Sequence, residues 1–232
     1  MSVFDSAENV ARYEAWFKEN RFAFESEIAA VKYLLPEGTG FEVGIGTGLF
    51  AERLGIRLGN DPSEEMLRVA RSRGREVYCC PGERLPFPDG SFDYTLMVTT
   101  ICFLNEPEAV LRECRRVVKR NGYVVVGFID SKSPLGRFYR EKADRSVFYR
   151  EATFYSAVQV TKMLVDAGFE VDGTCQTLFG AMDPVTAPQK ARDGTGQGSF
   201  VIMRGIRRET FNQPQAKQLW KNENRNKRCT NS

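Results

Sequence analysis

Residues 42 to 48 read Glu42-Val43-Gly44-Ile45-Gly46-Thr47-Gly48 and follow a segment rich in proline and glycine at residues 36–40. The three alternate glycines predict a tight turn after a buried strand, because side chains at these positions would keep a ligand away from the backbone. The stretch therefore predicts an α/β fold with a ligand site at the end of a strand.

The spacing of the glycines separates two classes of nucleotide ligand. A dinucleotide-binding turn has the pattern Gly-x-Gly-x-x-Gly, whereas here the third glycine, Gly48, comes one residue earlier. Glu42 stands just before the turn. Asp61 follows nineteen positions after Glu42, where a carboxylate can bind a nucleoside. Together these features favour S-adenosylmethionine over NAD.

The composition fits a single α/β domain. The 232 residues contain no run of eighteen apolar residues, and the N-terminus lacks the regions of a secretory signal. The six cysteines form no Cys-x-x-Cys pair and histidine is absent, so we expect reduced thiols, a cytoplasmic protein and no metal site. The lack of histidine also excludes Ser-His-Asp and Cys-His hydrolase mechanisms.

The positive net charge belongs to the end of the chain. Residues 207–232 hold seven Lys/Arg against two Glu, a net charge of +5, so the rest of the chain carries 3 − 5 = −2. An acidic body argues against nucleic acid as a partner. The tail itself is poor in apolar residues and has the composition of a disordered segment.

Helical and strand patterns alternate along the chain. Two N-terminal helices are expected over 5–18 and 22–35, a further helix over 107–119 that Asn121-Gly122 ends, and a polar and aromatic insertion over 130–155. The order predicts a single doubly wound, mostly parallel seven-stranded sheet, and the missing helix between the last two strands permits an antiparallel final strand. The expected organisation is a helical cap, a cofactor-binding domain and a tail, at residues 1–35, 36–206 and 207–232.

Four blocks of the sequence together resemble a known family. They are the glycine turn at 42–48, the segment from Asn60 to Leu67, the loop from Leu85 to Asp93, and the helix and turn from Leu111 to Gly122. In this order they are similar to the class I S-adenosylmethionine-dependent methyltransferases, in particular the UbiE-like (methyltransferase type 11) group, over residues 35–130. The resemblance implies the Rossmann-like methyltransferase fold and a small-molecule methyl acceptor.

The resemblance also implies which residues bind S-adenosylmethionine. Asp61 would accept hydrogen bonds from both ribose hydroxyls, and Glu42 would brace the turn and reach the amino group through water or backbone. The remaining candidates would lie under the methionine part, around the adenine or near the methionine carboxylate: Gly44, Ile45, Gly46, Pro62, Met66, Gly82, Glu83, Thr99, Tyr13 and Arg21.

The chain departs from the family pattern at two places. Many relatives carry an Asp where this chain has Pro81, so contacts to the adenine must come from the backbone or from Glu83. Relatives often have a histidine pair after the fourth strand, where this chain reads Thr99-Thr100-Ile101-Cys102-Phe103. That run, with the segments 133–137 and 146–149, resembles prokaryotic methyltransferases sometimes labelled amine N-methyltransferases.

The acceptor would lie over the carboxyl ends of the strands. Segments that reach this edge supply three candidate catalytic residues: Asp130, Tyr139 and Tyr149. They also supply candidate substrate contacts, whose aromatic faces suit a cationic amine or a flat ring: Trp16, Thr100, Cys102, Arg137 and Phe148.

Other functions stay open at this point. The chain could bind S-adenosylmethionine without catalysis, or be an NAD(P) enzyme with the same sheet. Arsenite methylation is a further alternative, because Cys79, Cys80, Cys102 and Cys175 could supply thiols if three of them converged on one pocket. The sequence identifies neither the acceptor atom nor the oligomeric state.

Overall fold

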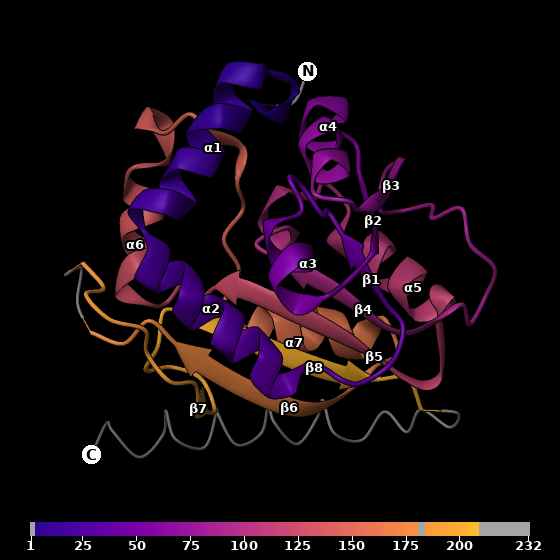
Figure 1. Ribbon diagram of the computed structural model, residues 1–232. Helices are drawn as coiled ribbons and strands as arrows, with labels where there is room; N and C mark the ends of the chain where they lie inside the picture. The colour runs from indigo at the N-terminus through magenta and orange to yellow at the C-terminus, as the bar shows by residue number, and fades with distance from the viewer. Residues whose placement is uncertain (1–2, 181–183, 209–232) are drawn as a thin grey trace, which may run out of the picture.

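The computed structural model describes residues 3–180 and 184–208, which form a mixed sheet with strand order β3-β2-β1-β4-β5-β8-β6-β7 (Figure 1). Six strands are parallel, while β8 runs antiparallel between β5 and β6, which confirms the predicted antiparallel final strand. The two-residue edge strand β7 makes eight strands where we expected seven. The strands are β1 Gly40–Val43, β2 Leu58–Asp61, β3 Glu76–Cys79, β4 Phe92–Val98, β5 Val118–Ile129, β6 Glu170–Thr177, β7 Arg192–Asp193 and β8 Phe200–Ile206.

Helices cover both faces of the sheet. Helices α2 and α3 pack on one face, and α5 and α7 pack on the other (Figure 1). The helices are α1 Ala7–Glu19, α2 Arg21–Leu34, α3 Leu49–Leu54, α4 Glu64–Ser72, α5 Pro107–Val117, α6 Pro134–Glu141 and α7 Ala157–Asp166. Four 3₁₀ turns complete the described chain: η1 Val3–Asp5, η2 Ile101–Phe103, η3 Ala143–Arg145 and η4 Tyr149–Glu151.

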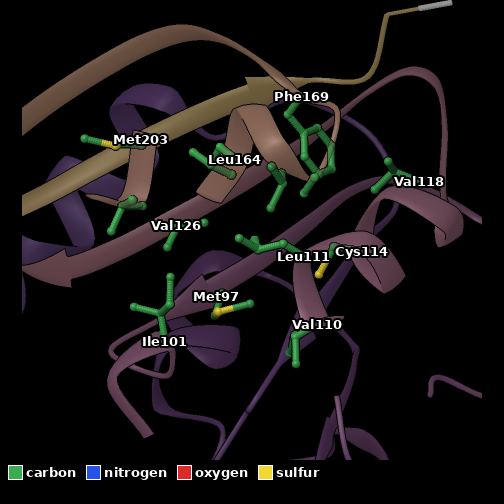
Figure 2. Packing of buried hydrophobic residues seen from close by; sticks show 14 of the residues in the cluster. Met97, Ile101, Val110, Leu111, Cys114, Val118, Val126, Leu164, Phe169 and Met203 are labelled. Atoms are coloured by element: carbon green, nitrogen blue, oxygen red, sulfur yellow. The ribbon is translucent and has the colours of Figure 1, made fainter. Parts of the chain in front are cut away.

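The core on the α5/α7 face explains why the central strands are so apolar. Leu111 of α5 and Leu164 of α7 pack with Val126 of β5 and Met203 of β8, and all four side chains are almost fully buried (Figure 2). A second cluster lies under α2 on the opposite face. Since β4 and β5 are covered on both sides, their sequences are nearly continuous apolar runs.

Helix α5 ends earlier than the sequence predicted. It ends at Val117, and β5 begins at once, because Val118 pairs with Phe92 of β4 across a shift in register. Asn121, expected to end the helix, lies inside β5 with a left-handed φ of 59°. Tertiary pairing therefore overrides the helical pattern of residues 118–119.

The predicted tail is anchored at its start. The backbone N–H of Arg207 donates to the carbonyl of Gly122, and its guanidinium donates to the carbonyls of Arg115 and Val118. Arg208 is paired with Glu170. The rest of that expectation, residues 209–232, lies outside the described residues.

The insertion at residues 130–155 positions the site. It follows β5 directly and contains α6 and two short 3₁₀ turns, and α6 lies near the carboxyl end of β5 (Figure 1). The N-terminal helices and this insertion thus stand over the edge of the sheet where parallel α/β proteins bind ligands.

Candidate functional site

The glycine turn after β1 leaves its backbone open at Gly46. Gly44 and Gly46 both have left-handed φ angles, of 70° and 54°. A Cβ at Gly44 would come within 2.3 Å of the methyl carbon of Thr100. A Cβ at Gly46 would instead point into the space between the Tyr13 hydroxyl, at 3.8 Å, and the Met66 sulfur, at 4.0 Å. This space is bounded by α1, α4 and the turn.

Asp61 holds the turn and still has acceptor capacity. Its two carboxylate oxygens accept from the backbone N–H of Gly46 at 3.1 Å and of Ser63 at 2.9 Å. Burial raises the pKa of Asp61 to about 6, and these two hydrogen bonds limit the rise. An ionised carboxylate offers about four lone-pair sites, so two remain for vicinal hydroxyls.

Glu42 is a buried carboxyl with an unpartnered atom. It is 2 % exposed, one oxygen accepts from the backbone of Ala51, and Oε2 has no partner among the described residues. Burial, reinforced by Asp61, raises the pKa of Glu42 well above its usual value. Within the part of the chain that the structure describes, the Thr47 hydroxyl and the Asn60 side-chain oxygen are also buried without partners. A ligand with an amino group would satisfy such acceptors.

A cavity of about 540 Å³ lies beyond the turn; we call it the aromatic cavity. Its walls come from α1, α2, α6, the segment after β4 and the loop after β6. Rings from these segments dominate the lining, among them Tyr13, Trp16, Tyr139, Phe148, Tyr149 and Phe154. The rings of Tyr139 and Tyr149 are stacked with centroids 4.4 Å apart, and their hydroxyls share a hydrogen bond.

Two residues with unusual backbones line the same cavity. Thr99, at the end of β4, has φ 52°, and Leu178, after β6, has φ 57°. The left-handed region is rare for a β-branched residue such as Thr99. The Thr99 N–H donates to the carbonyl of Gly127 at 2.8 Å, which helps to fix it in place. Such strain is often found at functional sites.

Glu27 of α2 also lines the aromatic cavity, and our sequence reasoning missed it. It is 3 % exposed, and burial raises its pKa to about 8. The signal was present in the sequence, because Glu27 lies between Phe24 and Val31 at the spacing of the buried face of the helix. A charged residue in such a stripe is seldom buried without a role.

The candidate residues fall into two groups that share a border. At the turn, the structure brings together Glu42, Gly44, Ile45, Gly46, Asp61, Met66 and Thr100. Around the aromatic cavity it brings together Tyr13, Trp16, Thr99, Cys102, Tyr139, Phe148 and Tyr149. Tyr13 belongs to both places, because it also faces Gly46 and feels the charges of Glu42, Asp61 and Glu27.

Three other candidates have local partners instead. Asp130 is buried, but its carboxylate accepts from the backbone N–H of Lys132 and it is not among the residues lining the aromatic cavity. Arg21 is exposed and stacks on Phe22, with 4.4 Å from its guanidinium carbon to the ring centroid. Arg137 is exposed and donates to the carbonyl of Lys132.

The predicted adenine contacts are divided between core and surface. Gly82 is buried, and a Cβ there would come within 3.1 Å of Val43 and Val110. Pro62 and Glu83 are exposed.

Within residues 3–180 and 184–208, no group of three His, Cys, Asp or Glu side chains could hold a metal ion. Of the four cysteines considered for arsenite, only Cys102 lines the aromatic cavity; Cys79 is exposed and Cys175 is buried elsewhere. The thiols therefore do not converge, which argues against arsenite methylation. Every helix of the described chain is too short or too polar to cross a membrane.

The fold and the glycine turn define a Rossmann-like α/β protein with binding sites at the carboxyl ends of its parallel strands. A family model described as a methyltransferase domain matches residues 41–126. A solved structure from Thermotoga maritima, described as a SAM-dependent methyltransferase and possible histamine N-methyltransferase, is 45% identical, covers 87% of this chain and 98% of its own, and has a TM-score of 0.84.

Relatives by sequence agree with this match. An uncharacterized protein of Methanocaldococcus jannaschii is 41% identical over 203 residues, which are 88% of this chain and 98% of that protein. The ubiquinone/menaquinone biosynthesis C-methyltransferase UbiE of Cupriavidus metallidurans is a more distant relative, 38% identical over 86 residues, 34% of this chain and 35% of UbiE. The chain belongs to the class I S-adenosylmethionine-dependent methyltransferases.

The residues present fit the cofactor that this family implies. The unpartnered Glu42 oxygen suits its amino group, and the free lone pairs of Asp61 suit its ribose hydroxyls. The space that Gly46 leaves open between Tyr13 and Met66 gives the ligand access to the backbone. S-adenosylmethionine is therefore the cofactor, and an NAD(P) enzyme is excluded by the family.

Proposed function

We propose that this methyltransferase moves the methyl group to a small-molecule acceptor, an amine, a phenol or quinol or a similar compound, bound in the aromatic cavity. The observation that carries the proposal is the position of this cavity, which shares Tyr13 with the glycine turn. Its volume of about 540 Å³ lies in the range of pockets that bind small ligands.

The proposed chemistry depends mainly on alignment. Bound S-adenosylmethionine supplies a methyl group on a sulfonium sulfur, which an acceptor atom displaces in line. Asp61, Glu42 and the glycine turn would hold one side of the reaction, and Thr99 with Tyr13 would lie at the border with the acceptor. Fixing two reactants in this way can contribute about 7–11 kcal/mol to catalysis, so the proposal needs no nucleophilic side chain.

The chemistry of the cavity lining also bears on the acceptor. The lining is largely aromatic and aliphatic, which suits an acceptor with a flat or apolar body. The similarity to a possible histamine N-methyltransferase adds histamine to the acceptors worth testing.

A methyl-transfer screen tests the proposal. Purified protein would be incubated with S-adenosylmethionine and with histamine, aliphatic amines, phenols or quinol precursors, and release of S-adenosylhomocysteine would be measured. We expect turnover with at least one acceptor. Tight calorimetric binding of S-adenosylhomocysteine without turnover on any acceptor would instead support the alternative, a cofactor-binding protein without catalysis.

A further inference from the structure

Glu27 is a buried acid that faces the aromatic cavity rather than a partner. No described residue donates a hydrogen bond or forms an ion pair with its carboxyl group, and burial is the sole cause of its raised pKa, about 8. Leaving such a group in an apolar site costs stability. A ligand that supplies the missing hydrogen-bond donor would account for this unpaired, buried carboxyl group.

The rest of the cavity indicates the charge of that partner. Among its described lining residues there is no Lys or Arg, while Glu19 supplies a second acidic side chain. An anionic acceptor such as a phenolate would thus meet two carboxyl groups and no cation. An ammonium group would meet a carboxylate, which forms its strongest hydrogen bonds with cations.

The aromatic rings around Glu27 point to the same charge. The hydroxyls of Tyr13, Tyr139 and Tyr149 lie close enough to Glu27 to feel its charge, and they come from α1, α6 and η4. Trp16 of α1 adds an indole to the same lining. Faces of Trp and Tyr attract cations most strongly where water is excluded.

We infer that the acceptor is a primary or secondary amine that enters as an ammonium ion, and that Glu27 binds this group and removes its proton. The inference rests on the proposed small-molecule methyl transfer and names the acceptor class and the residue that selects it. The proton would pass from nitrogen to the Glu27 carboxylate. The lone pair left on nitrogen would then form the bond to the methyl carbon as the carbon–sulfur bond breaks, with its electron pair staying on the sulfur of S-adenosylhomocysteine. The methylated amine would leave as a cation, and the proton on Glu27 would go to solvent.

Matched pairs of ligands test the inference without turnover. Each pair differs only in the group that would face Glu27: butylamine and butanol, 2-phenylethylamine and 2-phenylethanol, histamine and 4-(2-hydroxyethyl)imidazole. Binding to the protein saturated with S-adenosylhomocysteine would be measured by calorimetry at pH 7. We expect at least one amine to bind more tightly than its alcohol, and Glu27→Gln to weaken that amine by roughly 10- to 150-fold, as for lost charged hydrogen bonds.

The number of protons released on ligand binding distinguishes the proposed role of Glu27 from a purely structural one. With a pKa of about 8, Glu27 is mostly protonated at pH 7, so binding an ammonium ion should release most of one proton. Calorimetry in buffers of different ionisation enthalpy measures this number on the unmodified protein, even if Glu27→Gln folds poorly. Glu25→Gln, on the same helix but outside the cavity lining, is the matched control and should behave as the unmodified protein.

Several results would overturn the inference. They are an equal affinity for every amine and its alcohol, no binding of any amine, no proton release, or an amine preference that survives Glu27→Gln. Methyl transfer to phenols alone would refute the inference and leave the proposed function intact. Failure to transfer a methyl group to any acceptor would instead refute the proposed function, while the amine preference could still be measured.

Discussion

Replacing Glu27 by Gln should change how the stability of this protein depends on pH. Burial raises the pKa of Glu27 from 4.5 to about 8 in the folded state, so the folded protein binds this proton more tightly than the unfolded chain. An acid whose pKa is raised in the folded state does not lower the free energy of unfolding well below pH 4.5. Its destabilising effect grows as the pH rises from 4.5 through 8. Glutamine carries no charge at any pH, so the variant should escape this loss.

The size of the effect follows from the pKa difference. The folded and unfolded pKa values differ by 8 − 4.5 = 3.5, and a pKa difference of one corresponds to about 1.36 kcal/mol. Linkage then gives a penalty of about 1 kcal/mol at pH 5 and about 5 kcal/mol at pH 9, which differ by about 4 kcal/mol. Water entering the cavity reduces such values, so we expect Glu27→Gln to gain about 2–4 kcal/mol relative to the unmodified protein between these two pH values.

Urea unfolding at pH 5, 7 and 9, followed by circular dichroism, provides the measurement. The desolvation cost of the Gln amide does not vary with pH, so it cancels when the two proteins are compared across pH. Glu25→Gln should show a difference that is constant with pH. A constant difference for Glu27→Gln as well would show that Glu27 is solvated in the folded protein, and the argument from its burial would be wrong.

Three further predictions concern the cofactor side. Asp61→Ala should weaken S-adenosylhomocysteine binding by about 1–3 kcal/mol, the usual loss for charge-assisted hydrogen bonds; unchanged calorimetric affinity would contradict the assignment. The advantage in affinity of the unmodified protein over Asp61→Asn should shrink as the pH drops through the Asp61 pKa of about 6, because protonation removes the carboxylate. Gly46→Ala should abolish binding while Gly55→Ala does not, although both positions have left-handed φ angles, because only a Cβ at Gly46 points toward Tyr13 and Met66; equal affinities for the two variants would refute this reading.

The glycine turn and Asp61 could be predicted because each depends on a short contiguous motif. Asp61 comes directly from β2, and the turn comes directly from β1, so the neighbouring parallel strands bring them together whatever the rest of the chain does. The alternation of strands and helices likewise predicted the sheet, and the missing helix between the last two strands permitted its antiparallel final strand. These features are set by local pattern, and the fold preserves them.

Other features depend on contacts between distant segments. Helix α5 ends at Val117 because β4 pairs with Val118, an interaction that no helical pattern reveals. Asp130 follows β5 directly, as expected for a residue at the ligand-binding edge, yet its carboxylate accepts from its own loop. Glu27, in contrast, was not predicted but lines the cavity. Helical periodicity places it on the buried face of its helix but cannot distinguish a cavity from a packed core.

The glycine turn and the aromatic cavity both contain buried acidic side chains. Glu42 and Asp61 at the glycine turn and Glu27 in the aromatic cavity are buried acids whose pKa values are all raised by burial. Tyr13 stands between them and feels all three, which further disfavours loss of its own proton. A cationic ligand would favour the ionised form of the acid that it contacts. Each ligand would therefore offset the desolvation cost of its own acid and not that of the acids at the other site. If the acceptor is the proposed amine, it and the cofactor would each be compensated by their own carboxylates despite their like charges.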